Sequence, residues 1–285
     1  MKFQVLLYYW YGVLEDAEEI MHQQRQICQR LGLTGRVIVA REGINGTIEG
    51  TLEATEAYAK EMLADERFKT THIKRSSGTG NSFPKLSVKL RQEIVSSHFG
   101  EVDFNPAEFT APYIKAEELH EWIQNGKEFY IVDMRNSYEH LVGHFAGSIL
   151  PELRNFRDLK DALPTLAHLK DKVVVTVCTG GVRCEKASGF LLKSGFKEVY
   201  QLYGGIVTYM EKYPNKDFLG KLYVFDNRVT MGFNTDGTDH VVVGQCEKCG
   251  QPSEHYVNDD GGQYRKHFIC CEECAAKDVM LTAVA

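Results

Sequence analysis

The chain has 285 residues, of which 43% are hydrophobic and 25% charged, and its formal net charge is −6 at pH 7. This composition is ordinary for a globular protein with two domains or one large one. No apolar run approaches the roughly 20 residues that cross a bilayer, which excludes a membrane-spanning protein, and the negative charge argues against a general nucleic-acid coat while allowing a local basic face.

The first twelve residues, MKFQVLLYYWYG, hold a short apolar stretch but no small-residue cleavage site before the acidic segment that follows. They therefore predict a strand and not a secretion signal. Several of the eight cysteines are spaced as in metal sites or catalytic loops, which is typical of a reducing compartment. We therefore expect a cytoplasmic protein.

Residues 1–100 form the first predicted domain. Strands are expected over 3–10, 35–40, 71–75 and 85–95, and helices over 15–31 and 52–63, while residues 41–50 are expected to form a Gly/Asn turn that leads into another strand. The order β-α-β-β-α-β predicts an α+β, ferredoxin-like (acylphosphatase-like) sheet with its helices on one face.

Residues 115–215 form the second predicted domain, after a proline-containing linker at 100–115. Helices are expected over 116–125 and 184–194, and strands over 129–135, 172–178 and 198–205. Strands that alternate with helices predict a parallel α/β sheet, in which ligands bind beyond the carboxyl ends of the strands. Cys178 ends one such strand, and Asp133 and Arg135 end another.

The segment CTGGVRC runs from Cys178 to Cys184 and opens a predicted helix. A cysteine near a helix N-terminus has its thiolate stabilised by the helix dipole. Gly180 and Gly181 let successive backbone N–H groups converge into an anion cradle, next to the permanent charge of Arg183. The pattern predicts a nucleophilic Cys178 that can carry an anionic sulfur adduct. Cys184 could resolve an oxidised Cys178 as a disulfide or could simply pack, and the sequence leaves both open.

Residues 216–285 form a predicted C-terminal tail with a strand at 222–225 and a cysteine cluster. Its pairs Cys246-x-x-Cys249 and Cys271-x-x-Cys274 are separated by 21 residues. This spacing is typical of a structural zinc site, in which each pair donates thiolates to a tetrahedral ion. The alternative is a set of reduced cysteines without metal.

Two segments resemble the rhodanese domains. VVVTVCTGGVRCEKAS (173–188) is similar to their active loop, C-x-x-G-x-R, and VDMRNSYEHLVGHFAGS (132–148) is similar to their D-x-R…E…G-H-x-x-G signature. The resemblance covers about residues 115–215 and implies a persulfide-carrying cysteine. Four residues separate Cys178 from Arg183, against five in related phosphatase loops, which favours sulfur over phosphate. A rhodanese fold used only as a scaffold is the alternative.

The whole chain resembles the rhodanese-related family of oxygen-dependent tRNA uridine(34) hydroxylases. The matching segments are GRVIVAREGINGTIEG (35–50), FPKLSVKLRQEIV (83–95), VDMRNSYEHLVGHFAGSI (132–149), CTGGVRCEKAS (178–188), YQLYGGIVTYME (200–211) and VFDNRV (224–229). The resemblance implies a monooxygenase-like oxidoreductase that uses molecular oxygen and forms 5-hydroxyuridine at the wobble position of tRNA. The alternative is a rhodanese-type sulfurtransferase, because both reactions begin with the same thiolate.

Site residues follow from the loop and the resemblance together. Cys178 and Arg183 are predicted to be catalytic, with support from Asp133, Arg135, Gly180, Gly181 and Cys184. The candidates for binding tRNA are Arg36, Arg41, Lys74, Arg75, Lys85, Lys89 and Arg91. On one strand, Lys85, Lys89 and Arg91 would share a face that could track phosphates, although a merely solvated face is the alternative. No flavin, haem or iron motif is visible, so zinc is the one cofactor considered.

Overall fold

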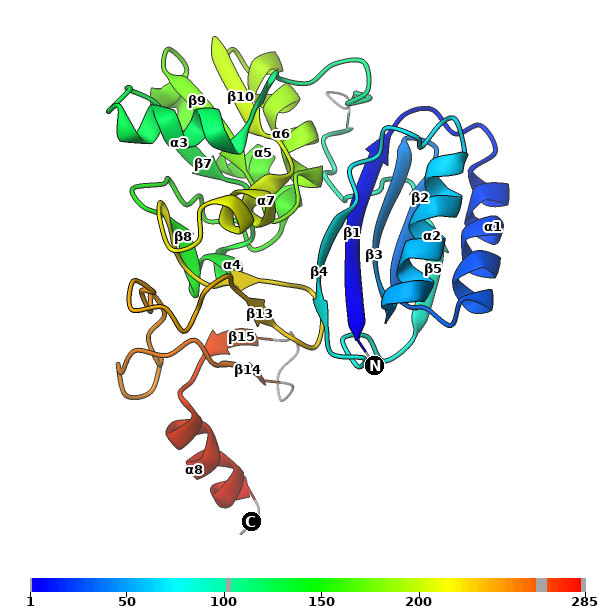
Figure 1. Cartoon of the computed structure of the whole chain (residues 1–285). Coiled ribbons are helices and arrows are strands. Elements are labelled where there is room, and N and C mark those ends of the chain that lie inside the picture. The colour runs from blue at the N-terminus through cyan, green and yellow to red at the C-terminus, as the bar shows by residue number, and fades with distance from the viewer. Residues whose placement is uncertain (1, 101–103, 260–265, 283–285) are drawn as a thin grey trace.

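Two larger β-sheets organise the part of the chain that the computed structural model describes, residues 2–100, 104–259 and 266–282 (Figure 1). The first is mixed and has its helices on one face, and the second is parallel with helices around it. The predicted combination of a ferredoxin-like sheet, a rhodanese-like α/β domain and a cysteine-containing C-terminal region is confirmed.

The N-terminal sheet has the strand order β4-β1-β3-β2-β5. Its strands are β1 (Phe3–Tyr11), β2 (Thr34–Ala40), β3 (Gly43–Thr51), β4 (Lys74–Gly78) and β5 (Leu86–Leu90). Helices α1 (Ala17–Arg30) and α2 (Leu52–Ala64) cover the face turned away from the second sheet (Figure 1). The last strand is shorter than the expected 85–95, because beyond Leu90 the chain leaves the sheet and Glu93 folds back to accept from Ser97 N–H at 3.2 Å.

Strand β1 consists almost entirely of apolar and aromatic residues, because other parts of the protein pack against both of its faces. Side chains alternate across a strand, so Leu6 and Tyr8 enter the core beneath α1 and α2. Leu7, Tyr9 and Tyr11 point the other way, toward the second domain, where the Tyr11 hydroxyl donates to the Val182 carbonyl at 3.2 Å. The register of this one strand therefore sets which side chains the first domain presents to the second.

The second sheet has the order β6-β10-β9-β7 and is parallel throughout. Its strands are β6 (Tyr113–Ile114), β7 (Tyr130–Asp133), β9 (Val173–Val177) and β10 (Glu198–Leu202). The helices around it are α3 (Ala116–Gln124), α4 (Ser137–His140), α5 (Leu159–Ala162), α6 (Val182–Lys193) and α7 (Gly205–Lys212), and β8 (Gly143–Phe145) pairs with β11 (Phe218–Gly220). Helix α6 begins two residues before the expected 184, directly after Gly181.

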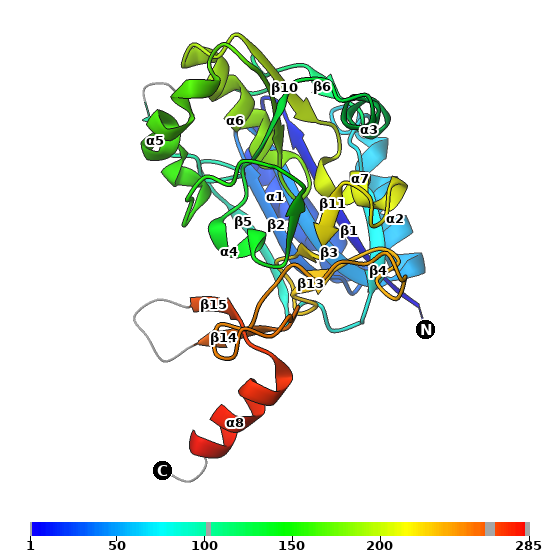
Figure 2. The same ribbon diagram turned by 90° about the vertical axis from the view of Figure 1, so that its left-hand side faces the viewer.

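The C-terminal region descends from the second domain as two small hairpins and a helix (Figure 2). β12 (Leu222–Tyr223) pairs with β13 (Thr230–Met231), so the predicted strand at 222–225 ends earlier, where the chain turns. β14 (Tyr256–Asp259) pairs with β15 (Lys266–Ile269), and α8 (Glu272–Thr282) follows. None of the described helices is long and apolar enough to cross a membrane.

A buried lysine joins the two domains. Lys186 on α6 is fully buried, and its ammonium lies 2.8 Å from Glu42 and 2.7 Å from Glu93. Glu42 follows β2, and Glu93 lies just beyond β5. A buried charge is tolerated only when it is paired, so this contact requires the second domain to sit in one place against the first.

Lys186→Met removes the ammonium and leaves two mostly buried carboxylates facing each other. We expect the free energy of unfolding of the full chain to fall by about 3 kcal/mol, as when a buried ion pair loses one partner, measured by urea denaturation. Lys197→Met breaks the exposed pair with Asp171 and should leave the free energy of unfolding almost unchanged, because solvent screens such a pair. Equal losses in the two variants would contradict a special role for Lys186.

Candidate active site

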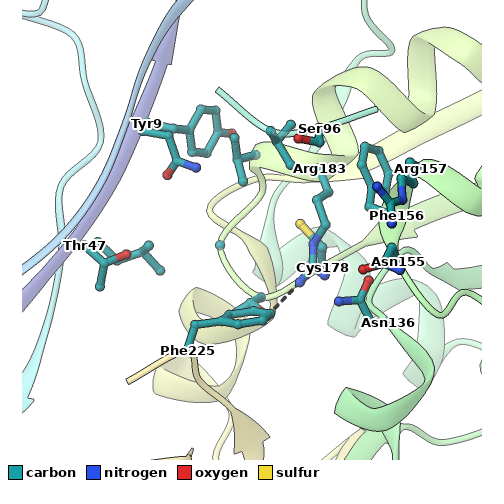
Figure 3. Close-up of a pocket in the computed structure, with 16 residues that line it drawn as sticks. Tyr9, Thr47, Ser96, Asn136, Asn155, Phe156, Arg157, Cys178, Arg183 and Phe225 are labelled. Atoms are coloured by element: carbon teal, nitrogen blue, oxygen red, sulfur yellow. Dashed lines mark hydrogen bonds between the residues drawn. The ribbon is translucent and has the colours of Figure 1, made fainter. Parts of the chain in front are cut away.

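Cys178 follows the last residue of β9 and lies at the bottom of a cavity between the two domains. The thiol is buried, and the N–H of Gly181 donates to its Sγ at 3.2 Å. The cavity has a volume of about 410 Å³, within the range of small-molecule sites. Figure 3 shows walls from three parts of the chain: Tyr9 and Thr47 from the first sheet, Asn136, Asn155, Phe156 and Arg157 from the second domain, and Phe225 from the C-terminal region.

The two glycines of the loop are needed for a reason beyond the anion cradle. A Cβ at Gly180 would lie 2.8 Å from Leu7 Cδ2, and one at Gly181 would lie 2.8 Å from the Tyr9 hydroxyl. Gly181 also has a φ of +104°, which side-chain-bearing residues rarely adopt. The loop is therefore built to let β1 of the other domain lie directly on it, which the local sequence pattern does not reveal.

The start of α7 holds the loop from its other side. The N–H of Ile206 donates to the Cys178 carbonyl at 2.9 Å, and that of Val207 donates to the Thr179 carbonyl at 3.1 Å. A Cβ on Gly205 would lie 2.7 Å from the Cys178 oxygen, so the approach needs a glycine. Sequence reasoning missed this contact, and the signal that could have found it is the Gly-Gly pair in YQLYGGIVTYME.

Arg183 is buried and paired rather than placed at an open rim. Its guanidinium binds both oxygens of the buried Glu139, at 2.6 and 2.9 Å, and donates to the Thr179 hydroxyl at 3.2 Å. Burial by itself lowers the pKa of Arg183, but the Glu139 carboxylate outweighs burial and raises it. The positive charge beside the loop is therefore permanent and is held in one orientation.

The surroundings of Cys178 favour its thiolate. Burial raises the pKa of the thiol, but donation from the Cys184 thiol, the Arg183 charge and backbone N–H groups together lower it to about 6. Burial and the nearby Cys178 raise the pKa of Cys184 well above its usual value. The thiolate form is thus favoured at Cys178, and the thiol of Cys184 remains protonated and donates to it.

Asp133 and Arg135 contribute to the frame around the loop and do not line the cavity. Both are fully buried, and their side chains bind each other at 2.7 Å. Arg135 also donates to the Gly143 carbonyl at 2.8 Å and to the Glu139 carbonyl at 3.2 Å. Through these contacts the pair supports α4, the helix that carries the partner of Arg183.

Lys74 lies inside the domain interface and not on an exposed face. Its ammonium is 5.1 Å from the centre of the Tyr9 ring, in the layer that covers the loop. Burial lowers the pKa of Lys74 to about 8, while the charges of Cys178 and Glu185 oppose this change. Lys74 is therefore a cation within electrostatic range of Cys178. The sequence pattern predicted it only as a contact for tRNA phosphates.

The other basic candidates are distributed over several surfaces. Arg41 and Arg75 are exposed and form ion pairs with Glu15 and Glu56, respectively. The guanidinium of Arg36 donates to the carbonyl of Phe225, at the mouth of the cavity. Lys85, Lys89 and Arg91 are exposed along the edge strand β5, with Lys85 and Arg91 just outside its ends. Arg157 is a further exposed cation, which lines the cavity and which sequence reasoning missed.

Four cysteines of the C-terminal region converge, although two of them are far from the others in the chain. The Sγ atoms of Cys246, Cys249, Cys271 and Cys274 all lie within 4.8 Å of one another. Zinc–sulfur bonds of about 2.3 Å place tetrahedral sulfurs about 3.8 Å apart, and Cys249 and Cys271 are 3.7 Å apart. The donor set and its spacing fit a tetrahedral metal ion, so the cluster could hold one.

Family models match the chain in three consecutive parts. The UPF0176 acylphosphatase like domain matches residues 3–94, the rhodanese-like domain matches residues 115–212, and the rhodanase C-terminal model matches residues 219–283. The matches cover both sheets and the region that contains the cysteine cluster.

Curated relatives match along nearly the whole chain. A tRNA uridine(34) hydroxylase of Oceanobacillus iheyensis is 42% identical over 275 residues, which are 95% of this chain and 84% of that protein. One of Bacillus cytotoxicus is 41% identical, over 96% of this chain and 85% of that protein. One of Cytophaga hutchinsonii is 38% identical, over 96% and 86%.

Cys184→Ala should raise the pKa of Cys178, because it removes the thiol that donates to the Cys178 sulfur. Absorbance of thiolate at 240 nm, as the difference between each protein and its Cys178→Ser counterpart, should titrate near pH 6 in the wild type and at higher pH in the variant. Cys28→Ala removes a buried thiol in the other domain and should leave the midpoint unchanged. A midpoint that Cys184→Ala does not move would contradict this source of stabilisation.

Proposed function

The chain belongs to the tRNA uridine(34) hydroxylase family of oxidoreductases, and we propose that it uses Cys178 and molecular oxygen to form 5-hydroxyuridine at the wobble position of tRNA. The proposal is carried by one observation: a thiolate-stabilising loop lies at the bottom of a cavity that both domains build. The substrate comes from the relatives, which are named as tRNA uridine(34) hydroxylases and match this chain along nearly its full length. We infer a cytoplasmic location from that substrate.

We favour a mechanism in which the Cys178 thiolate adds to C6 of the uracil ring. The new S–C6 bond pushes the C5–C6 π electrons onto C5 and the O4 carbonyl, which makes C5 a nucleophile. C5 then bonds to one atom of molecular oxygen, and the other atom leaves as water after a cellular reductant supplies two electrons and protons. Loss of the C5 proton and departure of the thiolate restore the double bond and free Cys178.

A second route keeps Cys178 as a carrier of oxidised sulfur. In that route the Cys178 thiolate takes the sulfane sulfur of a thiosulfate or persulfide donor, which leaves as sulfite or thiolate, or is oxidised to a sulfenate by a peroxide, which leaves as water. Either form would take part in oxygen activation, and Cys184, whose thiol donates to Cys178, could resolve it as a disulfide. A sulfurtransferase would use the same persulfide, but it would need neither the first domain nor the C-terminal region, both of which contribute walls to the Cys178 cavity. The routes differ in what Cys184 does, which a substitution can test.

The residues around the cavity have distinct proposed tasks. Arg183, held by Glu139, stabilises negative charge on the sulfur or its adduct. Asp133, Arg135, Gly180 and Gly181 maintain the shape of the loop. The exposed Lys85, Lys89 and Arg91 along β5 remain candidates for contacts with tRNA phosphates, together with Arg36, Arg41 and Arg75. Lys74 is buried between the domains and is no longer a candidate for such a contact.

We propose that the four-cysteine cluster holds a structural zinc ion. The cluster closes with four protein thiolates, the donor set of structural rather than catalytic zinc sites. Cys246 and Cys249 precede the β14–β15 hairpin, and Cys271 and Cys274 follow it. An ion at this point would fix the hairpin and the start of α8 to each other.

Cys178→Ala and Cys178→Ser should each abolish 5-hydroxyuridine and its derivatives in tRNA, because Cys178 is the one thiol among the described residues that line the cavity. The measurement is nucleoside mass spectrometry of tRNA from a deletion strain, without redundant pathways, that carries each variant. Cys184→Ser should keep most of the product if Cys184 only donates a hydrogen bond, and should lose it if Cys184 resolves an oxidised Cys178. Full activity of Cys178→Ala, or an unchanged hydroxyuridine level in the deletion strain, would reject the proposal.

Freshly reduced protein should contain about one equivalent of zinc per chain by elemental analysis, and Cys271→Ser should lose it. The matched control is Cys270→Ser, because this neighbouring cysteine has its N–H bound to the His255 carbonyl at 3.0 Å and lies outside the four-sulfur cluster. Less than about half an equivalent in the wild type, or equal loss in the two variants, would argue against the site.

A further inference from the structure

Phe225 is a large apolar side chain that stays exposed at the mouth of the Cys178 cavity. It is 44% exposed, and it lines the same cavity as Cys178 and Thr179 (Figure 3). It belongs to the C-terminal region, whereas Tyr9, which lines the same cavity, belongs to the first sheet. An exposed aromatic ring beside a reactive sulfur suggests a contact for a flat, partly apolar ligand.

The turn that presents Phe225 is firmly anchored to the first domain. Asp226 and Arg228 are paired at 2.6 Å, and Asp226 is almost fully buried. Arg228 also donates to the Ser76 hydroxyl and the Ser77 carbonyl, both at 2.9 Å, which are residues of the edge strand β4. A side chain presented for binding gains from such a rigid support, because little conformational freedom remains to be lost.

Further bonds hold the same turn from both ends. The N–H of Asn227 donates to the Ser82 carbonyl at 2.9 Å, and its side chain donates to the Asn81 carbonyl at 2.8 Å. Val229 closes the turn with a φ of +59°, which is costly for a β-branched residue and persists only where the surroundings impose it. The backbone is thus held in a strained form that leaves the Phe225 ring exposed.

One side of the ring is already occupied. The Arg183 guanidinium carbon lies 5.8 Å from the ring centre, and the Tyr223 ring meets it edge-on at 5.3 Å. Phe225 nevertheless lines the cavity and remains 44% exposed. We propose that Phe225 is the stacking platform for the target base, a single unstacked pyrimidine whose C6 is then presented to Cys178.

This inference rests on the proposed function and adds the base-binding subsite to it. Proteins that read single-stranded RNA loops splay bases out and stack them on aromatic rings, a contact that tolerates any base because each has a π-face. A thiolate attacks C6 from above the plane of the base, so the base has to be supported flat. The Arg183 guanidinium, 5.8 Å from the centre of the Phe225 ring, adds a cation to the stack.

The test measures binding of anticodon stem-loop RNAs that have either uridine or an abasic ribose at position 34. All proteins are full-length and carry Cys178→Ser to prevent turnover, and fluorescence anisotropy gives the two dissociation constants. We expect the abasic RNA to bind about 5- to 100-fold more weakly than the uridine RNA. Phe225→Ala should bring this ratio close to one, and Phe225→Trp should keep it.

Phe109→Ala is the matched control, because Phe109 is exposed to a similar degree, 40%, and lies outside the cavity. It should retain the ratio. A ratio that Phe225→Ala leaves unchanged, or equal affinity of the starting protein for the two RNAs, would overturn the stacking subsite. Failure of the proposed function is recognised separately, by an unchanged hydroxyuridine level in tRNA of the deletion strain.

Discussion

The contact on which the rest of the structure depends is made by two consecutive residues in the first turns of α6. Lys186 binds Glu42 and Glu93, and the buried Glu185 accepts from the Tyr9 hydroxyl at 2.8 Å and the Tyr113 hydroxyl at 2.7 Å. Both buried side chains are bound by residues of the first domain, and Glu185 is also bound by Tyr113 of the second sheet, so that only one docking geometry satisfies them. Because α6 begins directly after the cysteine loop, its first two turns fix both the placement of the second domain against the first and the shape of the loop.

A consequence is that the arginines near Cys178 are already paired with carboxylates before any substrate binds. Arg183 forms an ion pair with Glu139, and Arg135 forms one with Asp133. The thiolate is then stabilised by short-range donors and by an arginine that has no freedom to move away. In an enclosed site of low dielectric such fixed dipoles act more strongly than they would in water. Lys74 adds a cation from the first domain, so neither domain alone makes the complete electrostatic environment.

The C-terminal region belongs to this arrangement as well. Its first turn presents Phe225 at the cavity, and farther along, the Tyr256 hydroxyl donates to the Tyr138 carbonyl on α4, next to Glu139. The ring of His267 stacks on Tyr138 with 5.1 Å between centres. The strand pair β14–β15, which the four cysteines flank, is therefore in contact with α4, the helix whose Glu139 binds Arg183. A metal ion at the cluster would stabilise the site from outside, without touching the chemistry.

Apolar periodicity and motif spacing were enough to predict the two sheets, their order along the chain, the glycine-rich cysteine loop and the two cysteine pairs of the C-terminal region. These features are local: apolar periodicity, glycine positions and ligand spacing act over a few residues. The sequence by itself could not show that Leu7 and Tyr9 lie on Gly180 and Gly181, that Lys74 is buried near Cys178, or that Phe225 closes the cavity. Those contacts join residues 47 to 173 positions apart in the chain, and the docking of the domains through Lys186 brings them together. The expectation for Lys85, Lys89 and Arg91 shows the same limit: strand periodicity placed them on one face, but β5 ends at Leu90, because burial of Glu93 against Lys186 draws the chain out of the sheet.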